Sequence, residues 1–163
     1  MLHRHRLLVA FCLSLLGPQL PAEDEAADPA LELYFAANAA YNRRLYPIAA
    51  GNYQSFLSRY AAHPKAQLAR YGLGLSQFAL KQYDKAVAEF LKLINEPKLD
   101  KKIERGRLTL LHAQCLLYGG KKEEAQARLV AAASNLPAGV HQTGAIAAVA
   151  DLFFGQNDWQ KTV

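Results

Sequence analysis

Cysteine is scarce in this sequence, and its scarcity limits the chemistry that the chain can support. Two cysteines, Cys12 and Cys115, occur in 163 residues. Cys12 lies in an N-terminal segment that we expect to be removed, and the single remaining thiol cannot form an internal disulfide. Cys115 stands in the apolar run LLHAQCLLYG, where we expect a small buried side chain rather than a reactive nucleophile.

The motifs that mark common enzyme sites are also missing. The sequence has no glycine-rich phosphate loop and no G-x-S-x-G nucleophile turn. Three histidines lie beyond the N-terminal segment, His63, His112 and His141, and none has a second ligand at metal-binding spacing. We therefore expect a protein that is not an enzyme, with no catalytic residue, no cofactor and no metal site.

Residues 1–22 have the pattern of a secretory signal peptide. Arg4 and Arg6 form a basic region, residues 7–17 form an apolar run, and Pro18 ends that run. The apolar run is too short to span a bilayer comfortably, so we predict cleavage rather than a transmembrane helix. A buried N-terminal helix or an uncleaved anchor is the alternative interpretation.

Ala22 offers a small residue for cleavage, and residues 23–28 are then expected to form a flexible mature N-terminus. The predicted location is the periplasm or cell envelope of a bacterium, with no transmembrane span after cleavage. An exported chain is a poor candidate for binding nucleic acid, so we expect no such partner. A peripheral association with the envelope stays open.

Charge of one sign does not dominate the chain. It has 19 lysines and arginines against 14 acids, a net charge of +5, and removing residues 1–22 leaves 17 against 14, or +3. So small an excess is weak evidence for a charged partner. The basic run KLDKKIERGR, residues 98–107, is interpreted as an exposed turn and helix start, with contact to anionic lipid or polysaccharide as the alternative.

Beyond Asp28 the sequence is typical of helices. Alternating β-branched runs are absent, and Ala, Leu, Gln, Lys and Arg dominate. Asp28 and Pro29 form an N-cap followed by a proline at the first helical position, and His63 with Pro64 resembles this arrangement with a weaker cap.

Proline and glycine breaks divide the rest of the chain into seven helices and the start of an eighth. Asp100 is expected to cap the fifth helix. Short connections make neighbouring helices antiparallel hairpins. The expected helices cover residues 29–45, 47–60, 64–80, 83–95, 100–118, 121–134, 140–155 and 158 onward.

The segment KQYDKAVAEF contains a size pattern that recurs along the chain. Tyr83 is followed by a small Ala86 and then by a large Phe90. We expect Ala86 to pack against Gly74 of the preceding helix, and Tyr83 and Phe90 to fill the joints with neighbouring hairpins. The corresponding triplets are Tyr46, Ala49 and Tyr53, and Lys122, Ala125 and Leu129. The small residues twelve positions before each alanine are Ala37, Gly74 and Ala113.

These features resemble the tetratricopeptide repeat, whose period is about 34 residues. The best match is residues 68–96, and the string FLSRYAAHPKAQLARYGLG resembles the repeats of exported bacterial envelope proteins of the Tol–Pal coordinator and outer-membrane assembly type. The resemblance implies an all-α fold, a right-handed superhelical solenoid of antiparallel helix hairpins with about three and a half repeats over residues 29–163.

In that family the first helix of each hairpin lines a concave groove that binds a protein or peptide. The resemblance therefore implies an exported scaffold, the alternatives being a helical accessory part of an envelope-polymer enzyme or a purely structural spacer. The groove positions carried across are Tyr34, Asn38, Tyr41, Tyr71, Leu75, Phe78, Arg107, Gln114 and Tyr118, with Asp151 and Phe154 from a fourth hairpin.

The last expected helix has barely begun at Trp159, whereas solenoids normally end in a helix with a polar outer face. We therefore expect the chain to be the N-terminal portion of a longer repeat protein, or a truncated product.

Overall fold

A computed structural model of the chain describes residues 28–135 and 138–155, with only the backbone for residue 135 and residues 152–155. The predicted signal peptide, the segment 23–27 and the helix expected from residue 158 lie outside the described residues. Within the described part there are seven α-helices and no strand. They are α1 (Pro29–Asn42), α2 (Tyr46–Arg59), α3 (Ala66–Ala79), α4 (Tyr83–Ile94), α5 (Arg105–Tyr118), α6 (Lys122–Asn135) and α7 (Val140–Gly155).

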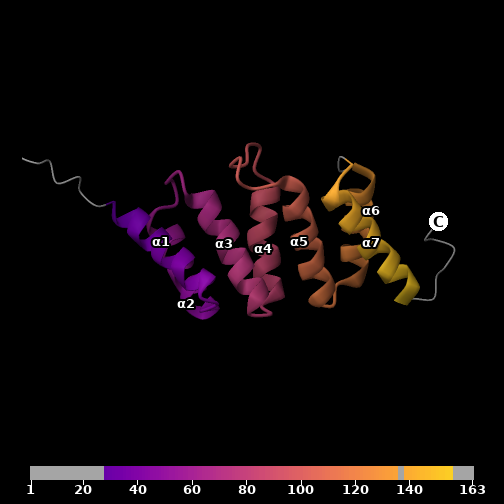
Figure 1. Cartoon of the computed structure of the whole chain (residues 1–163), viewed down its shortest axis with the longest axis horizontal. Helices are drawn as coiled ribbons and strands as arrows, with labels where there is room; N and C mark the ends of the chain where they lie inside the picture. The colour runs from indigo at the N-terminus through magenta and orange to yellow at the C-terminus, as the bar shows by residue number, and fades with distance from the viewer. Residues whose placement is uncertain (1–27, 136–137, 156–163) are drawn as a thin grey trace, which may run out of the picture.

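The helices stand side by side in one row, and each packs against the next in the chain (Figure 1). The turns inside the pairs α1–α2, α3–α4 and α5–α6 lie along the lower edge of Figure 1, and the connections between pairs lie along the upper edge. Helix α1 also contacts α3, and α5 contacts α7. The all-α prediction is thereby confirmed.

The three turns inside the hairpins have the same backbone structure. Arg44, Lys81 and Gly120 each adopt a positive φ, and they lie 37 and 39 residues apart. In every turn the amide of that residue bonds a carbonyl three positions earlier, and the next amide bonds a carbonyl five positions earlier. These bonds provide partners for carbonyl groups that are otherwise unpaired at a helix C-terminus. Because of this turn, the first helix ends at Asn42 rather than at the predicted residue 45.

Two helix starts test the predicted caps. The carboxylate of Asp28 accepts a hydrogen bond from the Ala30 amide at 2.9 Å, which confirms the first N-cap. The prediction that Asp100 caps a helix from Lys101 is wrong, because α5 begins at Arg105. The Asp100 amide instead donates to the side chain of Gln67 at 2.7 Å, and this distant bond holds the segment in turns.

Glycines in α3 allow aromatic rings from both neighbouring helices to approach closely. A Cβ atom on Gly74 would lie 2.5 Å from the ring of Phe90, and one on Gly72 would lie 2.4 Å from the ring of Tyr53. Gly74 therefore lies against the ring of Phe90, which the predicted pattern assigned to the joint between hairpins. Phe90 thus fills its own hairpin, because the missing side chain leaves room for a whole ring.

Candidate functional site

Helix α1 supplies three predicted groove residues, and two of them mainly support the fold. The ring of Tyr34 packs 6.4 Å from that of Tyr53 and 5.9 Å from that of Phe56, between ring centres. Asn38 accepts a hydrogen bond from the Tyr53 hydroxyl through its side-chain oxygen. Tyr41 lies further along the helix, half-buried, with its ring 5.5 Å from that of Tyr46.

Helix α3 supplies three more, and they lie against the core to different degrees. Tyr71 is half-buried, with its ring 6.1 Å from the ring of Phe90. Leu75 and Phe78 are partly buried and pack against the core formed with α4 and α5. Phe78 also contacts the ring of Tyr83 at 5.8 Å, so much of its surface serves to join helices.

Helix α5 supplies the most accessible members. Arg107 is exposed, Gln114 is partly buried, and Tyr118 is 57% exposed. The ring of Tyr118 lies tilted against two others, with its centre 6.0 Å from that of Phe78 and 5.6 Å from that of Tyr83, so these three rings join the second and third hairpins. Among the described residues, no hydrogen bond or ion pair uses the side chain of Arg107 or Gln114, and both are available to a ligand.

Electrostatic effects place Tyr41, Tyr71 and Arg107 in one environment, although they come from α1, α3 and α5. Burial raises the pKa of Tyr41, the nearby Tyr46 raises it further, and the guanidinium of Arg107 lowers it. Burial also raises the pKa of Tyr71, while Arg107 lowers it and Tyr41 and Glu104 raise it. Arg107 of α5 is thus near enough to both tyrosines to influence their ionisation, although no hydrogen bond among the described residues joins the three side chains.

This shared surface is rich in hydrogen-bond donors. The guanidinium of Arg107 and the two tyrosine hydroxyls can all donate, and the amide nitrogen of Asn38 remains for a further bond. Glu104 lies nearby but is paired with His141 of α7. Such a donor-rich surface can bond the carbonyl or carboxylate oxygens of a ligand. Asp151 of the fourth predicted hairpin is exposed, and the Phe154 side chain and Trp159 lie outside the described residues.

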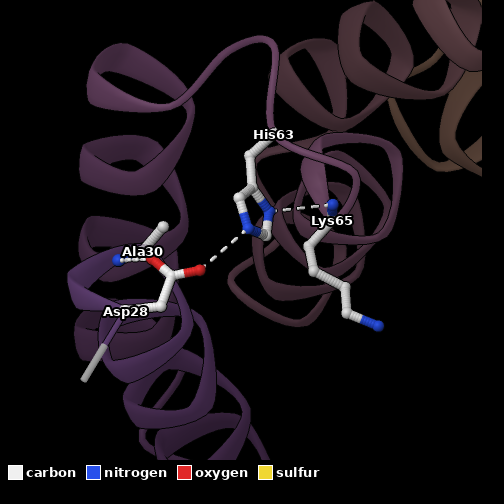
Figure 2. A network of polar contacts seen from close by, with 4 residues as sticks. All are labelled: Asp28, Ala30, His63 and Lys65. Carbon is white, nitrogen blue, oxygen red and sulfur yellow. Dashed lines mark hydrogen bonds and ion pairs between the residues drawn. The ribbon is translucent and has the colours of Figure 1, made fainter. Parts of the chain in front are cut away.

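The three histidines have structural surroundings. Figure 2 shows the ring of His63 between Asp28 and Lys65. The Lys65 amide donates to its Nδ1 at 3.0 Å, which leaves Nε2 to donate to the Asp28 carboxylate at 3.3 Å. His112 is buried, and its two ring nitrogens have no hydrogen-bond partner among the residues that the structure describes. Burial and the nearby Arg128 lower the pKa of His112 to about 4, so it is neutral at pH 7.

The remaining chemistry of the described chain is sparse. Burial raises the pKa of the Cys115 thiol to about 12, which agrees with the prediction of an inert buried cysteine. The residues that the structure describes include no group of three His, Cys, Asp or Glu side chains able to hold a metal ion. None of the helices in this part is both long and apolar enough to span a bilayer.

A second surface was missed from the sequence. The turn between α1 and α2 exposes Arg43 and Arg44 beside Leu45 and Ile48. The signal was present in the charge distribution, because residues 33–83 contain six lysines and arginines and no acid. The net charge of the whole chain conceals this local excess.

The chain was compared with known protein families and with curated proteins. No protein-family model matches the chain. No curated protein matches it either.

Proposed function

We propose that the chain is an exported, non-enzymatic scaffold of the tetratricopeptide type, which binds a protein or peptide segment in a groove formed by α1, α3 and α5. One observation carries the proposal. Helix α1 packs against α3, and the guanidinium of Arg107 on α5 lowers the pKa of both Tyr41 on α1 and Tyr71 on α3. Side chains from three such helices influence one another most directly if all three line one side of the row.

The repeat geometry supports the same arrangement. The hairpin turns recur at intervals of 37 and 39 residues with the same hydrogen bonds. Helix α1 contacts α3, and α5 contacts α7, which is expected if the row curves with its odd-numbered helices inside. We propose that this curvature is that of a right-handed superhelix, with the groove on its concave side.

The chemistry of the groove favours a peptide. Rigid aromatic rings provide contact area at a low cost in conformational entropy, and unpaired donors can bond backbone carbonyls along a segment. Tyr41, Tyr71 and Arg107 offer this combination, and the partly buried Asn38 and Gln114 lie on the same three helices.

A photo-crosslinking experiment tests the groove. A benzoyl-phenylalanine is placed at Gln114, on the predicted groove face of α5, and in a matched variant at the exposed Gln54 of α2. In cells that export the protein, the Gln114 variant should give a defined adduct whose peptide is identified by mass spectrometry. The Gln54 variant, on an even-numbered helix, should give none.

A second substitution links the adduct to the groove chemistry. Tyr71→Phe keeps the ring that packs on Phe90 and removes only the hydroxyl, so the fold should be retained. It should weaken the Gln114 adduct severalfold. Equal adducts from both crosslinker positions, or no adduct from either, would show that the odd-numbered helices do not form a binding groove, and a structural spacer would then be the better description.

A further inference from the structure

The turn between α1 and α2 is a protruding surface outside the groove. Its sequence from residue 43 to 48 is RRLYPI, and it combines charge with exposed aliphatic groups. Arg43 and Arg44 are exposed, while Leu45 is 46% and Ile48 is 55% exposed. In the described part of the chain, neither guanidinium takes part in a hydrogen bond or an ion pair.

These cations have no acid nearby to neutralise them. The sequence contains no Asp or Glu between Glu32 and Asp84, and of the six lysines and arginines in that interval only Arg70 has an ion-pair partner among the described residues. Asp84 itself is paired with Lys121, with a distance of 2.9 Å between Oδ1 and Nζ. The first two hairpin turns therefore carry uncompensated positive charge.

The equivalent turns extend this surface along one edge of the molecule. All three lie along the lower edge in Figure 1. The second turn exposes Lys81 and Lys85, and the third exposes Tyr118 and Lys122. Glutamates 123 and 124 accompany the third turn, so the excess of positive charge is greatest at the first two.

The backbone also holds two of these cations in a strained conformation. Arg44 has a φ of 60° and Lys81 a φ of 58°, and the same position in the third turn is Gly120. Glycine adopts this conformation without a steric penalty, whereas a side chain disfavours it. The fold thus keeps a charged side chain at each of these turns where the uncharged glycine would be less strained.

We propose that this turn edge, defined by residues 43–48 with Lys81 and Lys85, docks onto a bilayer that contains anionic phospholipids. The cations lie at the level of the lipid phosphates, where each basic residue adds to the electrostatic attraction. Leu45 and Ile48 enter the interface, since aliphatic groups gain free energy when they leave water for the boundary of the acyl chains. A protruding apolar tip suits a bilayer better than a soluble polyanion, which offers nothing for aliphatic side chains.

The opposite edge differs in a way that provides a control. Lys98, Lys101 and Lys102 are exposed there, but they alternate with Glu96, Asp100 and Glu104. The most exposed large apolar side chain on that edge is Val140, at 84%. It stands beside His141, which is paired with Glu104, rather than within a cluster of free cations.

The test places a single tryptophan at either edge of the full chain. Trp159 is the only tryptophan, so Trp159→Phe gives a background in which Ile48→Trp or Val140→Trp reports on its own surroundings. Each protein is mixed with brominated vesicles of phosphatidylcholine, with or without phosphatidylglycerol. We expect quenching for Ile48→Trp with phosphatidylglycerol only, and no quenching for Val140→Trp. Bromine quenches only a tryptophan close to it, so the signal reports on position 48 or 140 even if residues 7–17 also contact lipid.

Two further changes separate charge from apolar insertion. In the Ile48→Trp background, Arg43→Gln with Arg44→Gln should reduce the affinity for anionic vesicles roughly 25-fold, or about fivefold for each charge. Lys101→Gln with Lys102→Gln should leave it unchanged. Leu45→Ser with Ile48→Ser is made in the parent sequence, and its affinity for the same anionic vesicles is measured by cosedimentation. This double substitution should reduce that affinity about tenfold.

Three results would overturn the proposal. The first is no quenching at position 48, and the second is equal quenching at positions 48 and 140. The third is a loss on replacing Arg43 and Arg44 but none on replacing Leu45 and Ile48, which would identify a polyanion or an acidic protein as the partner.

Discussion

The turns inside the three hairpins and the joints between successive hairpins are built in different ways. Each turn repeats one backbone pattern around Arg44, Lys81 and Gly120. Each joint links residues at the start of one odd-numbered helix to residues at or just before the start of the next odd-numbered helix. The side chains that make this link differ from joint to joint. Asp28 bonds His63, Gln67 bonds the backbone of Lys98 and Asp100, and Glu104 pairs with His141.

The turn inside a hairpin therefore depends on local backbone hydrogen bonds, whereas a joint depends on contacts between side chains far apart in sequence. A turn needs only that a helix ends and the chain reverses, and the backbone itself supplies the bonds. A joint needs polar groups that are 31 to 37 residues apart in sequence to meet. Several side-chain pairs can meet that need, so joints vary while turns repeat.

The largest effect is expected inside the second hairpin, at Gly74. A methyl group there would lie 2.5 Å from the buried ring of Phe90, so Gly74→Ala should lower the free energy of unfolding by about 2 kcal/mol through overpacking. The matched control is Gly51→Ala, because a Cβ at Gly51 meets nothing within 4 Å. That control should raise stability by about 0.5–1 kcal/mol. Urea unfolding followed by circular dichroism measures both, and a gain in stability for Gly74→Ala would contradict the close approach.

A smaller effect is expected at the joint between the second and third hairpins. The Gln67 side chain donates to the Lys98 carbonyl at 3.0 Å and accepts from the Asp100 amide at 2.7 Å. Gln67→Ala removes both bonds and should cost about 1 kcal/mol, since water can partly replace them at this exposed site. The exposed Gln54→Ala is the control.

Hydrogen exchange makes the joint prediction specific to its location. In Gln67→Ala the Asp100 amide should exchange faster than in the parent protein, while amides within α3 and α4 keep their protection. Gln67→Glu retains an acceptor for Asp100 but no donor for Lys98, so it should protect the amide and recover part of the stability. Uniformly faster exchange along α3 would mean instead that Gln67 supports the helix itself.

The same distinction explains what could be predicted from the sequence. Helix 83–95 was predicted within one residue of its observed end, because the signals for its start and stop are local. The predicted start at residue 100 was wrong, because α5 begins at Arg105. The Asp100 amide instead bonds the side chain of Gln67, 33 residues away. No local pattern encodes such a bond.

The candidate site remains a prediction. The repeat register places Tyr41, Tyr71 and Arg107 on α1, α3 and α5, but it does not fix how near their side chains come. The register does not predict that the ring of Tyr118 contacts those of Phe78 and Tyr83. It fixes the position of a residue on its helix, but not the neighbour that its ring contacts. The basic turn at residues 43–48 was missed because only the total charge was counted.

The smallest effect is expected at the first joint, where Asp28 is exposed to solvent. Its bond from the Ala30 amide lowers its pKa below the ordinary value of 3.8, and the nearby His63 lowers it further. A carboxylate with a depressed pKa in the folded state contributes stability above its unfolded pKa and loses it as the pH falls through the folded value. Asp28→Asn retains an N-cap oxygen but cannot ionise.

The parent protein should therefore be slightly more stable than Asp28→Asn at pH 6, and this difference should shrink as the pH falls below about 4. Urea midpoints of the two proteins, measured in parallel from pH 6 to pH 2.5, test this directly. Subtracting one curve from the other removes the titration of all other groups that the substitution leaves unchanged. A difference that stays constant with pH would mean that Asp28 acts only through hydrogen-bond geometry, and that its charge contributes nothing to the joint.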